Sequence, residues 1–400
     1  MKIILTLLAG LLIGWVSGQT TTVLFIGNSY TNGNDLPELF RKIAGTNNKN
    51  VFVDSYTING ATFQAHSTNA ATMNKIKERK WDYVIIQGQS QELSFSDYQV
   101  DRNSLPAAVN ISDSIYKNHF CTELMMFMTW GRKDGDPQWE PISTYEGMQE
   151  RLYNGYMRVA DSSQASVAPV GVVWREMRNS LPGIELYQDD KSHPTMAGSY
   201  LAAASIYTSV FRELPGDGSY KAGLDNSYFV TLKGIMNSSI LSDLQRYHLR
   251  TRENHTTADF ELIQNERTIH VKSLARKYRE IRWNFGDGST STEQEVEQTY
   301  FNDEIYNVKL IAESECNTNE NVKIIYIGTA GLENKEAEEK FYIDNTKIVY
   351  KGIEKRVYIY TVNGQLIDET GEKEITTEFY PSGIYIVTDG ISMLKIHKIR

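Results

Sequence analysis

Apolar and polar positions alternate along the first half of the chain with two different periods. Five short, mostly uncharged runs rich in β-branched and aromatic residues predict buried strands; they are residues 22–26, 51–57, 81–86, 123–129 and 166–173. Apolar residues recur at helical spacing in residues 36–44, 73–80, 105–117, 145–162 and 196–207. Alternating strands and helices build a parallel sheet with helices on both faces. We therefore predict a three-layer α/β/α domain with a five-stranded parallel sheet over residues 19–215.

The second half of the chain changes to short strands of period two, separated by turn residues. Such runs fill residues 256–328, which is typical of a small β-sandwich. Residues 329–400 begin with a charged linker and continue as short strands, with Asn363-Gly364 at a hairpin turn. Residues 216–255 are mixed in pattern and are either an extension of the first domain or a linker.

The first 18 residues have the pattern of a cleaved leader. Met1-Lys2 supplies a charged start, residues 3–15 are an apolar run, and Val16-Ser17-Gly18 offers small residues for cleavage. We predict a signal peptide at residues 1–18, with a retained amino-terminal anchor as the alternative. Other apolar runs are too short to cross a bilayer, so the mature form is expected to have no transmembrane segment.

Composition limits the classes of function. The chain has 400 residues, 40% hydrophobic and 23% charged, as in globular proteins of two or three domains. The formal net charge of −9 argues against a nucleic-acid-binding protein, which usually has a basic surface. Cys121 and Cys316 fall in different predicted domains, so we expect two isolated, mostly buried thiols. The histidines lack metal-ligand spacing, and we expect no metal.

A strand-to-helix turn near the start carries the first candidate for chemistry. Gly27 follows the run 22–26 and permits a sharp turn. Ser29 then lies at the carboxyl end of a strand, where open α/β sheets place their sites. A serine in this setting can be a nucleophile, but glycine and serine are also ordinary turn residues, so the local pattern leaves both interpretations open.

A second candidate stretch, Asp190-Lys-Ser-His193-Pro194, enters the apolar helix predicted at 196–207. At this spacing the carboxylate can bond one ring nitrogen of His193 and fix its tautomer. The other ring nitrogen is then free to take the proton of Ser29. The alternative is that Asp190 caps a turn and His193 is a surface residue.

Together the two stretches resemble the SGNH (GDSL) hydrolase family over residues 22–212. The block Gly-Asn28-Ser-Tyr-Thr is similar to a sub-branch in which asparagine replaces the usual aspartate. The resemblance implies an SGNH-type, flavodoxin-like fold and an enzyme that needs no cofactor. It implies that Ser29 is the nucleophile, His193 the general base and Asp190 the acid that orients the base.

The same resemblance implies an oxyanion hole. Gly60 follows the second predicted strand and matches the family's second block, and the Ser29 amide is a further donor. The family's third block normally supplies an asparagine. Here Gln87-Gly-Gln89-Ser-Gln stands in its place and is similar to the Gln-Gly-Glu-Ser variant of some carbohydrate acetylesterases. We assign the third donor to Gln89, with Gln87 as the alternative.

Three other side chains follow strand ends. Trp130 and Trp174 come after the fourth and fifth predicted strands. We expect them either to shape a substrate pocket, together with Gln87, or to pack helix ends onto the sheet. His66, just past Gly60, is expected to be a solvated loop residue rather than a substrate contact.

Two appended modules also show resemblances. Trp283-Asn-Phe-Gly-Asp-Gly288 resembles the PKD domain, an Ig-like sandwich. Tyr380-Pro-Ser-Gly-Ile-Tyr385 and the terminal strand resemble the C-terminal sorting domain of the type IX secretion system of Bacteroidetes. With the leader, this implies a secreted or cell-surface protein that has the type IX secretion machinery as a partner.

These patterns predict a secreted serine esterase that hydrolyses small acyl esters, with O-acetyl groups on carbohydrate as the favoured substrate. A lipase- or thioesterase-like hydrolase is the alternative enzyme. An inactive surface protein that binds glycans or mediates adhesion is the alternative class, because the asparagine of the third block is missing.

Overall fold

The computed structural model divides the chain into two compact units, residues 1–252 and 253–400. The structure describes residues 20–249, 255–327, 341–344, 347–351, 356–361, 366–376, 380, 383–388 and 393–398. The predicted signal peptide at residues 1–18 lies outside the described residues.

The first unit is built on a parallel sheet with strand order β2-β1-β3-β4-β5. Its strands are β1 (Thr21–Gly27), β2 (Val51–Thr57), β3 (Tyr83–Ile86), β4 (Glu123–Phe127) and β5 (Ser166–Ala168). This is the flavodoxin-like order: the chain passes from β1 to β2 on one side of β1 and then to β3 on its other side, so the strand order switches between β1 and β3. The predicted α/β/α architecture with a five-stranded parallel sheet is confirmed.

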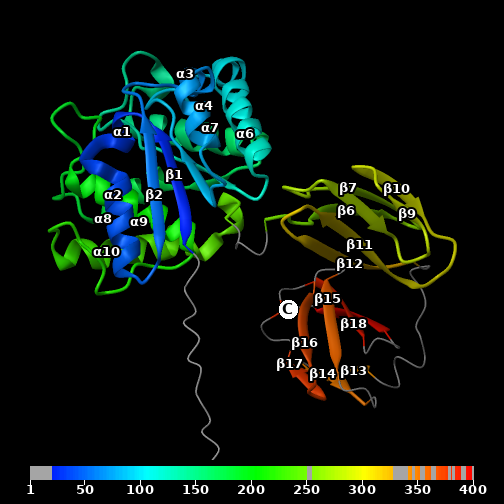
Figure 1. Cartoon of the computed structure of the whole chain (residues 1–400). Coiled ribbons are helices and arrows are strands. Elements are labelled where there is room, and N and C mark those ends of the chain that lie inside the picture. The colour runs from blue at the N-terminus through cyan, green and yellow to red at the C-terminus, as the bar shows by residue number, and fades with distance from the viewer. Residues whose placement is uncertain are drawn as a thin grey trace, which may run out of the picture. The chain divides into compact units, whose positions relative to one another are not determined.

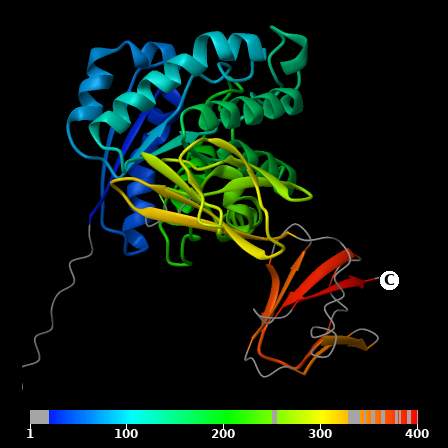
Figure 2. The same ribbon diagram turned by 90° about the vertical axis from the view of Figure 1, so that its right-hand side faces the viewer.

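Helices cover the sheet on both faces (Figure 1, Figure 2). The longer ones are α2 (Leu36–Thr46), α4 (Ala70–Lys77), α6 (Leu105–Asn118), α7 (Tyr145–Ser162), α8 (Val170–Ser180), α9 (Met196–Phe211) and α10 (Asn226–Ser239). Helices α2, α8 and α10 pack against α9, whereas α4 and α7 pack against α6. Residues 23–26 of β1 are fully buried between these layers, because a central parallel strand has both faces covered.

The predicted fifth strand is too long. The run 166–173 splits at Pro169: β5 ends at Ala168, and Val170 begins α8. A short apolar run cannot by itself be assigned to a buried strand or a buried helix, and most of this run is indeed buried. The shortened strand still leaves its carboxyl end on the same edge of the sheet as the others.

Residues 216–249, the described part of the segment left open at 216–255 that precedes its gap, pack with the first unit. Its helix α10 buries Tyr228, Phe229, Leu232 and Met236 in the same core as the sheet. Tyr228 also donates through its hydroxyl to the carbonyl of Ala197 at 2.6 Å. The part of this segment before residue 250 is therefore an extension of the α/β domain.

The second unit consists of antiparallel sheets. Residues 255–327 form sheets of order β10-β7-β6 and β12-β11-β8-β9 around a core that includes Trp283, as the predicted Ig-like sandwich requires. Their strands are β6 (Phe260–Asn265), β7 (Thr268–Ser273), β8 (Glu280–Asn284), β9 (Thr290–Ser291), β10 (Glu295–Thr299), β11 (Ile305–Glu313) and β12 (Thr318–Tyr326).

The last part of the chain forms two further antiparallel sheets, β13-β14-β17 and β16-β15-β18-β19. Their strands are β13 (Phe341–Asp344), β14 (Lys347–Tyr350), β15 (Val357–Thr361), β16 (Leu366–Thr370), β17 (Glu374–Thr376), β18 (Gly383–Thr388) and β19 (Met393–Lys398). The predicted turn at Asn363-Gly364 lies outside the described residues, but the strands on either side of it, β15 and β16, do pair.

Both cysteines differ from expectation. Cys121 and Cys316 are disulfide-bonded and only partly buried, so the expectation of two isolated, mostly buried thiols is wrong. That expectation rests on the positions of the two cysteines in different predicted domains. An exported chain, as the leader pattern predicts, meets an oxidising environment in which cysteines form disulfides.

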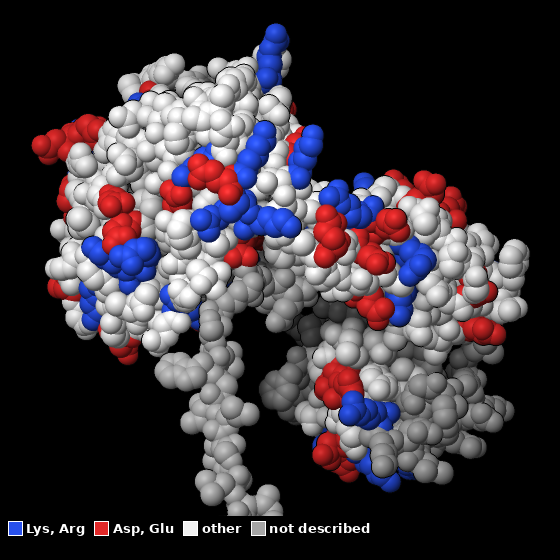
Figure 3. All heavy atoms as spheres, in the orientation of Figure 1, with Lys and Arg blue, Asp and Glu red and all other residues white. Residues whose placement is uncertain are grey.

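The described residues include neither a helix that is long and apolar enough to span a membrane nor a cluster of three His, Cys, Asp or Glu side chains suited to a metal ion. On the face shown in Figure 3, basic and acidic side chains are interspersed. Among the described residues, many charged side chains pair locally, as Lys191 Nζ does with Asp134 Oδ2 at 2.6 Å.

Candidate active site

The turn after β1 positions Ser29 as the first residue of a short helix, α1 (Ser29–Asn32). Gly27 ends the strand, and a Cβ there would overlap the side-chain oxygens of Thr31 and Gln87. Asn28 is the N-cap and accepts the backbone N–H of Tyr30 at 3.0 Å. The close approach of these groups requires glycine at position 27 and fixes the direction in which Ser29 leaves the strand.

Asn28 joins the loops at the carboxyl ends of three strands. Its side chain is buried, and its Nδ2 donates to the carbonyl oxygens of Ala61, after β2, at 3.1 Å and Gly88, after β3, at 3.3 Å. The Asn28 backbone N–H donates to Gln87 Oε1 at 3.1 Å. An aspartate has no N–H with which to make the two side-chain bonds, so the asparagine is specific to this arrangement.

His193 lies on a tight loop that precedes α9. The loop is closed by a bridge between Tyr187 and Pro194 and by the Gln188 N–H, which donates to the His193 carbonyl at 2.8 Å. Lys191 takes a positive φ of 60° to make the turn. These backbone bonds hold Asp190 and His193 on the same side of the loop.

The structure brings Ser29, His193 and Asp190 together. Ser29 Oγ lies 2.8 Å from His193 Nε2, and His193 Nδ1 bonds Asp190 Oδ2. Asp190 Oδ1 also accepts the backbone N–H groups of Ser192 at 3.0 Å and His193 at 2.9 Å. A hydroxyl, an imidazole and a carboxylate in this order can move a proton from the hydroxyl to the imidazole.

Electrostatics favour a charged Asp190. Burial raises the pKa of this carboxyl, but the hydrogen bonds from the His193 ring and from the His193 and Ser192 backbones outweigh burial, so its pKa lies below the ordinary value. The side chains of His193 and Asp190 remain 37% and 47% exposed. Asp190 is therefore charged, and both Asp190 and His193 are open to solvent.

Trp130 and Trp174 are fully buried, and their rings form a stack behind the histidine loop. Tyr30 and Trp130 are parallel with centroids 4.7 Å apart, and Trp130 and Trp174 are parallel at 3.9 Å. Trp130 Nε1 donates to the Ser192 carbonyl at 3.1 Å, and the Tyr30 hydroxyl bonds Ser192 Oγ at 2.6 Å. Both tryptophans thus support the loop of His193 from within the fold.

The three predicted oxyanion donors differ in their surroundings. Ser29 is the first residue of α1, so its N–H lies in the turn where helical amides lack an intrahelical acceptor. Gly60 is exposed with a φ of 69° and open space around it. The Gln89 amide instead folds onto its own loop, donating to Ser90 Oγ at 3.2 Å and to Gln91 Oε1 at 3.4 Å.

The Gln87 side chain hydrogen-bonds the turn that carries Ser29. It is fully buried; its Oε1 accepts from the Asn28 N–H and from Thr31 Oγ1 at 2.9 Å, and its Nε2 donates to the Gly88 carbonyl. Because these bonds all point into the fold, the structure places Gln87 beneath the candidate site.

The expectation that His66 is solvated is wrong. Its side chain is fully buried in α3 (Phe63–Ser67), with Nε2 3.0 Å from the Gly27 carbonyl and Nδ1 3.0 Å from Thr72 Oγ1. Burial lowers the pKa of His66, although the bond to Gly27 opposes this shift. A neutral His66 therefore supports the end of β1, one residue before Asn28.

Glu92 is a neighbour of the candidate site that the sequence motifs do not reveal. Both carboxylate oxygens accept the Phe63 N–H, at 3.0 and 3.1 Å, and one accepts the Gln89 N–H at 3.1 Å. It is the one charged residue between Asp82 and Asp97. A single carboxylate in an otherwise uncharged stretch after a buried strand is the sequence signal that could have drawn attention to it.

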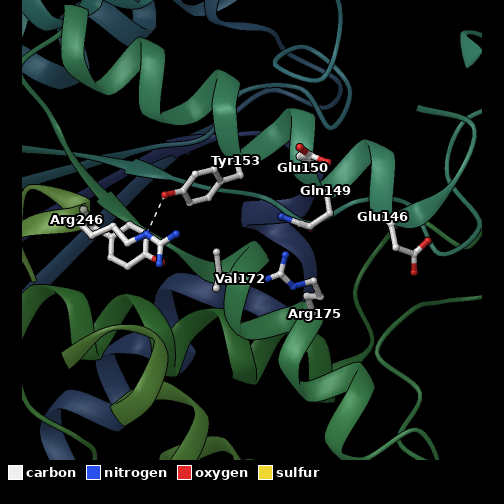
Figure 4. A pocket seen from close by; sticks show the side chains of 8 residues that line it. Glu146, Gln149, Glu150, Tyr153, Val172, Arg175 and Arg246 are labelled. Atoms are coloured by element: carbon white, nitrogen blue, oxygen red, sulfur yellow. Dashed lines mark hydrogen bonds between the residues drawn. The ribbon is translucent and has the colours of Figure 1, made fainter. Parts of the chain in front are cut away.

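A cavity of about 390 Å³ lies elsewhere on the first unit, between α7, α8 and the turn before residue 248 (Figure 4). Its wall includes Tyr153, Val172, Arg175 and Arg246, and none of Ser29, Asp190 or His193. Gln149 lies in the same wall and accepts the Gly131 N–H at 2.9 Å. The cavity is thus separate from the candidate active site.

We expect Asn28→Asp to lower the free energy of unfolding by about 2–4 kcal/mol, because it buries a carboxylate against two carbonyl oxygens that lose their donor. Chemical denaturation at pH 8 measures this, with Asn154→Asp, an exposed asparagine on α7, as the matched control. A variant as stable as the control would contradict the assigned role of the Asn28 amide.

The buried Glu92 gives stability a pH dependence. Burial raises its pKa from 4.5 to about 7, so folding favours the protonated form. The stabilisation is complete below pH 4.5 and is lost as pH rises through 7, a change of about 3 kcal/mol. Unfolding free energies of wild type and Glu92→Gln should therefore diverge between pH 5 and 8, whereas Glu150→Gln, at an exposed glutamate, should track wild type. Parallel curves would contradict the burial of this charge.

Comparison with known proteins finds matches to both units. A family model for the PKD domain matches residues 268–328. Similar solved structures include a DUF4886 family protein from Bacteroides uniformis, with 21% identity, coverage of 56% of this chain and 95% of that chain, and a TM-score of 0.48. An acetyl xylan esterase has 12% identity, coverage of 48% and 100%, and a TM-score of 0.38.

The PKD1 domain of the Vibrio cholerae metalloprotease PrtV has 23% identity, coverage of 18% of this chain and 98% of that chain, and a TM-score of 0.18. No curated protein matches the sequence. The range matched by the PKD model begins at β7 and runs past the end of β12. Residues 268–328 are therefore similar to a PKD domain in sequence.

Proposed function

We propose that the α/β domain is an SGNH-type serine esterase. The observation that carries this proposal is the 2.8 Å contact between Ser29 Oγ and His193 Nε2, with Asp190 bonded to the other ring nitrogen. These two stretches lie at opposite ends of the domain sequence, and a chance meeting at hydrogen-bond distance in this order of groups is a poor alternative explanation.

The proposed reaction has two halves. Ser29 Oγ bonds to the ester carbonyl carbon while its proton passes to His193, and the resulting oxyanion is held by backbone amides, with those of Ser29 and Gly60 as the proposed donors. Collapse breaks the ester bond, and the leaving alcohol takes the proton from His193. Water then attacks the acyl-Ser29 ester, again giving a proton to His193, and the carboxylic acid is released as Ser29 recovers its proton.

We propose small acyl groups, with O-acetyl on carbohydrate as the favoured substrate. The partial exposure of His193 and Asp190 supports an open site that a polymer chain can reach. The Gln87-Gly-Gln-Ser block, similar to that of some carbohydrate acetylesterases, supports the same class. A lipase would need a long apolar channel beside Ser29 for its acyl chain.

The test is hydrolysis of p-nitrophenyl acetate and p-nitrophenyl octanoate by the wild-type protein, followed by acetate release from a panel of acetylated polysaccharides. We expect activity on the acetyl ester, less on the octanoyl ester, and release from at least one polysaccharide. Preference for octanoate would support the lipase-like alternative. Absence of hydrolysis with retained glycan binding would support the inactive surface protein.

We also propose that the protein is exported and then released or attached at the cell surface through the type IX secretion machinery. The leader pattern at residues 1–18 and the terminal strand motifs support this proposal. Deletion of residues 341–400 should retain the protein inside the cell envelope of a type IX-competent host, while deletion of the PKD-like strands alone should not.

A further inference from the structure

The Glu92 carboxylate spans two loops at the candidate active site. Its oxygens accept the N–H of Phe63, the first residue of α3, and the N–H of Gln89. Gly88 permits this approach, because a Cβ there would lie 2.6 Å from Glu92 Oε2. Only 9% of Glu92 is exposed, so these protein donors replace water around the carboxylate.

The two loops are those to which the oxyanion donors are assigned. Phe63 lies three residues after Gly60, and Gln89 is itself the third candidate donor. On the other side, Asn28 bonds the carbonyls of the same two loops. The spacing between the loops therefore depends on two side chains, one that accepts from their amides and one that donates to their carbonyls.

We propose that Glu92 is a positioning residue that sets the geometry of the oxyanion hole, and that it does so in its carboxylate form. The proposal rests on the proposed esterase function. A carboxylate offers both oxygens as acceptors, whereas a carboxylic acid turns one of them into a donor that would face an N–H group. Oε2 accepts from both loops, and Oε1 shares the Phe63 N–H. A proton on Oε2 therefore removes an acceptor from both loops, and a proton on Oε1 removes one from the Phe63 loop.

The surroundings of Glu92 place its protonation near neutral pH. Burial is the largest influence on Glu92 and raises its pKa to about 7, against the hydrogen bonds from Phe63, Gln89 and Ser104. Tyr156 is a titratable neighbour, and burial first and then the Glu92 charge raise its pKa, so it stays neutral. Arg151 on α7 bonds the carbonyls of residues 94 and 95 in the same loop, and His66 is a titratable group on α3, the helix that begins at Phe63.

Activity as a function of pH tests the proposal. Loss of oxyanion geometry acts on the transition state, so Glu92→Gln should lower kcat at pH 8 by about 10- to 100-fold with little change in KM. The variant has no group at position 92 that must lose a proton, so kcat/KM of the wild type should fall more steeply on the acid side than that of the variant. Glu150→Gln should behave as wild type. An unchanged kcat, or equal acid slopes, would overturn the proposal.

Nuclear magnetic resonance tests the role of Glu92 without an assay of esterase activity. In the full wild-type chain, the amide proton resonances of Phe63 and Gln89 should titrate together with a midpoint near pH 7, and this step should be absent in Glu92→Gln. Shifts without that midpoint would overturn the proposal even if the variant failed to fold. If the shifts titrate but the wild type hydrolyses no ester, Glu92 does join the two loops and the esterase assignment is wrong.

Discussion

Replacing Ser29 by alanine is expected to lower kcat on p-nitrophenyl acetate by about 10⁵- to 10⁶-fold without unfolding the protein. The hydroxyl is the atom that forms the acyl bond, and triad groups act as a unit, so loss of the nucleophile removes almost all of their effect. The substitution removes a partly buried oxygen whose described side-chain partner is His193, so stability should change little.

The matched control for this variant is Ser114→Ala. Ser114 is partly exposed on α6 and bonds the Asn110 carbonyl within its own helix. Initial rates of both variants, with circular dichroism to confirm folding, complete the measurement. A Ser29→Ala protein with a few per cent of wild-type activity would mean that another group is the nucleophile, and the proposed esterase mechanism would be wrong.

Replacing Asp190 by asparagine is expected to lower kcat by about 10³- to 10⁴-fold. The carboxylate accepts from the ring and from two backbone N–H groups, whereas an amide presents an N–H to one of these donors and favours the wrong tautomer of His193. In that tautomer His193 Nε2 already carries a proton, so it cannot accept the proton of Ser29.

Asp189→Asn is the control for charge, because Asp189 is the exposed neighbour on the same loop. The two variants remove the same charge one residue apart, so a specific effect of Asp190 appears as a large kcat difference between them. Similar losses in both variants would indicate a general electrostatic effect of the loop, and Asp190 would then not be the orienting acid.

The parts of the site that follow from local rules could be predicted from the sequence. A β-branched run followed by Gly27 and Ser29 specifies a strand, a turn and a side chain at the strand's carboxyl end. The same handedness rule that builds the parallel sheet brings the loop of His193 to that edge. For these residues, chain order and one topological rule are enough.

The supporting residues could not be predicted in this way. Asn28 acts through carbonyls of two loops that are distant in sequence, and Glu92 through an amide 29 positions away. Such contacts depend on loop conformations that no periodicity reports. Trp130 and Trp174 illustrate the same limit, since a tryptophan after a strand fits a pocket wall and a buried stack equally well.

The three-residue spacing of Asp190 and His193 on one pinned turn has a consequence for motion. A displacement of that turn away from Ser29 would carry base and acid together, so the geometry between them would survive while the gap to the serine widened. Switching the catalyst off would then need no side chain to change its rotamer.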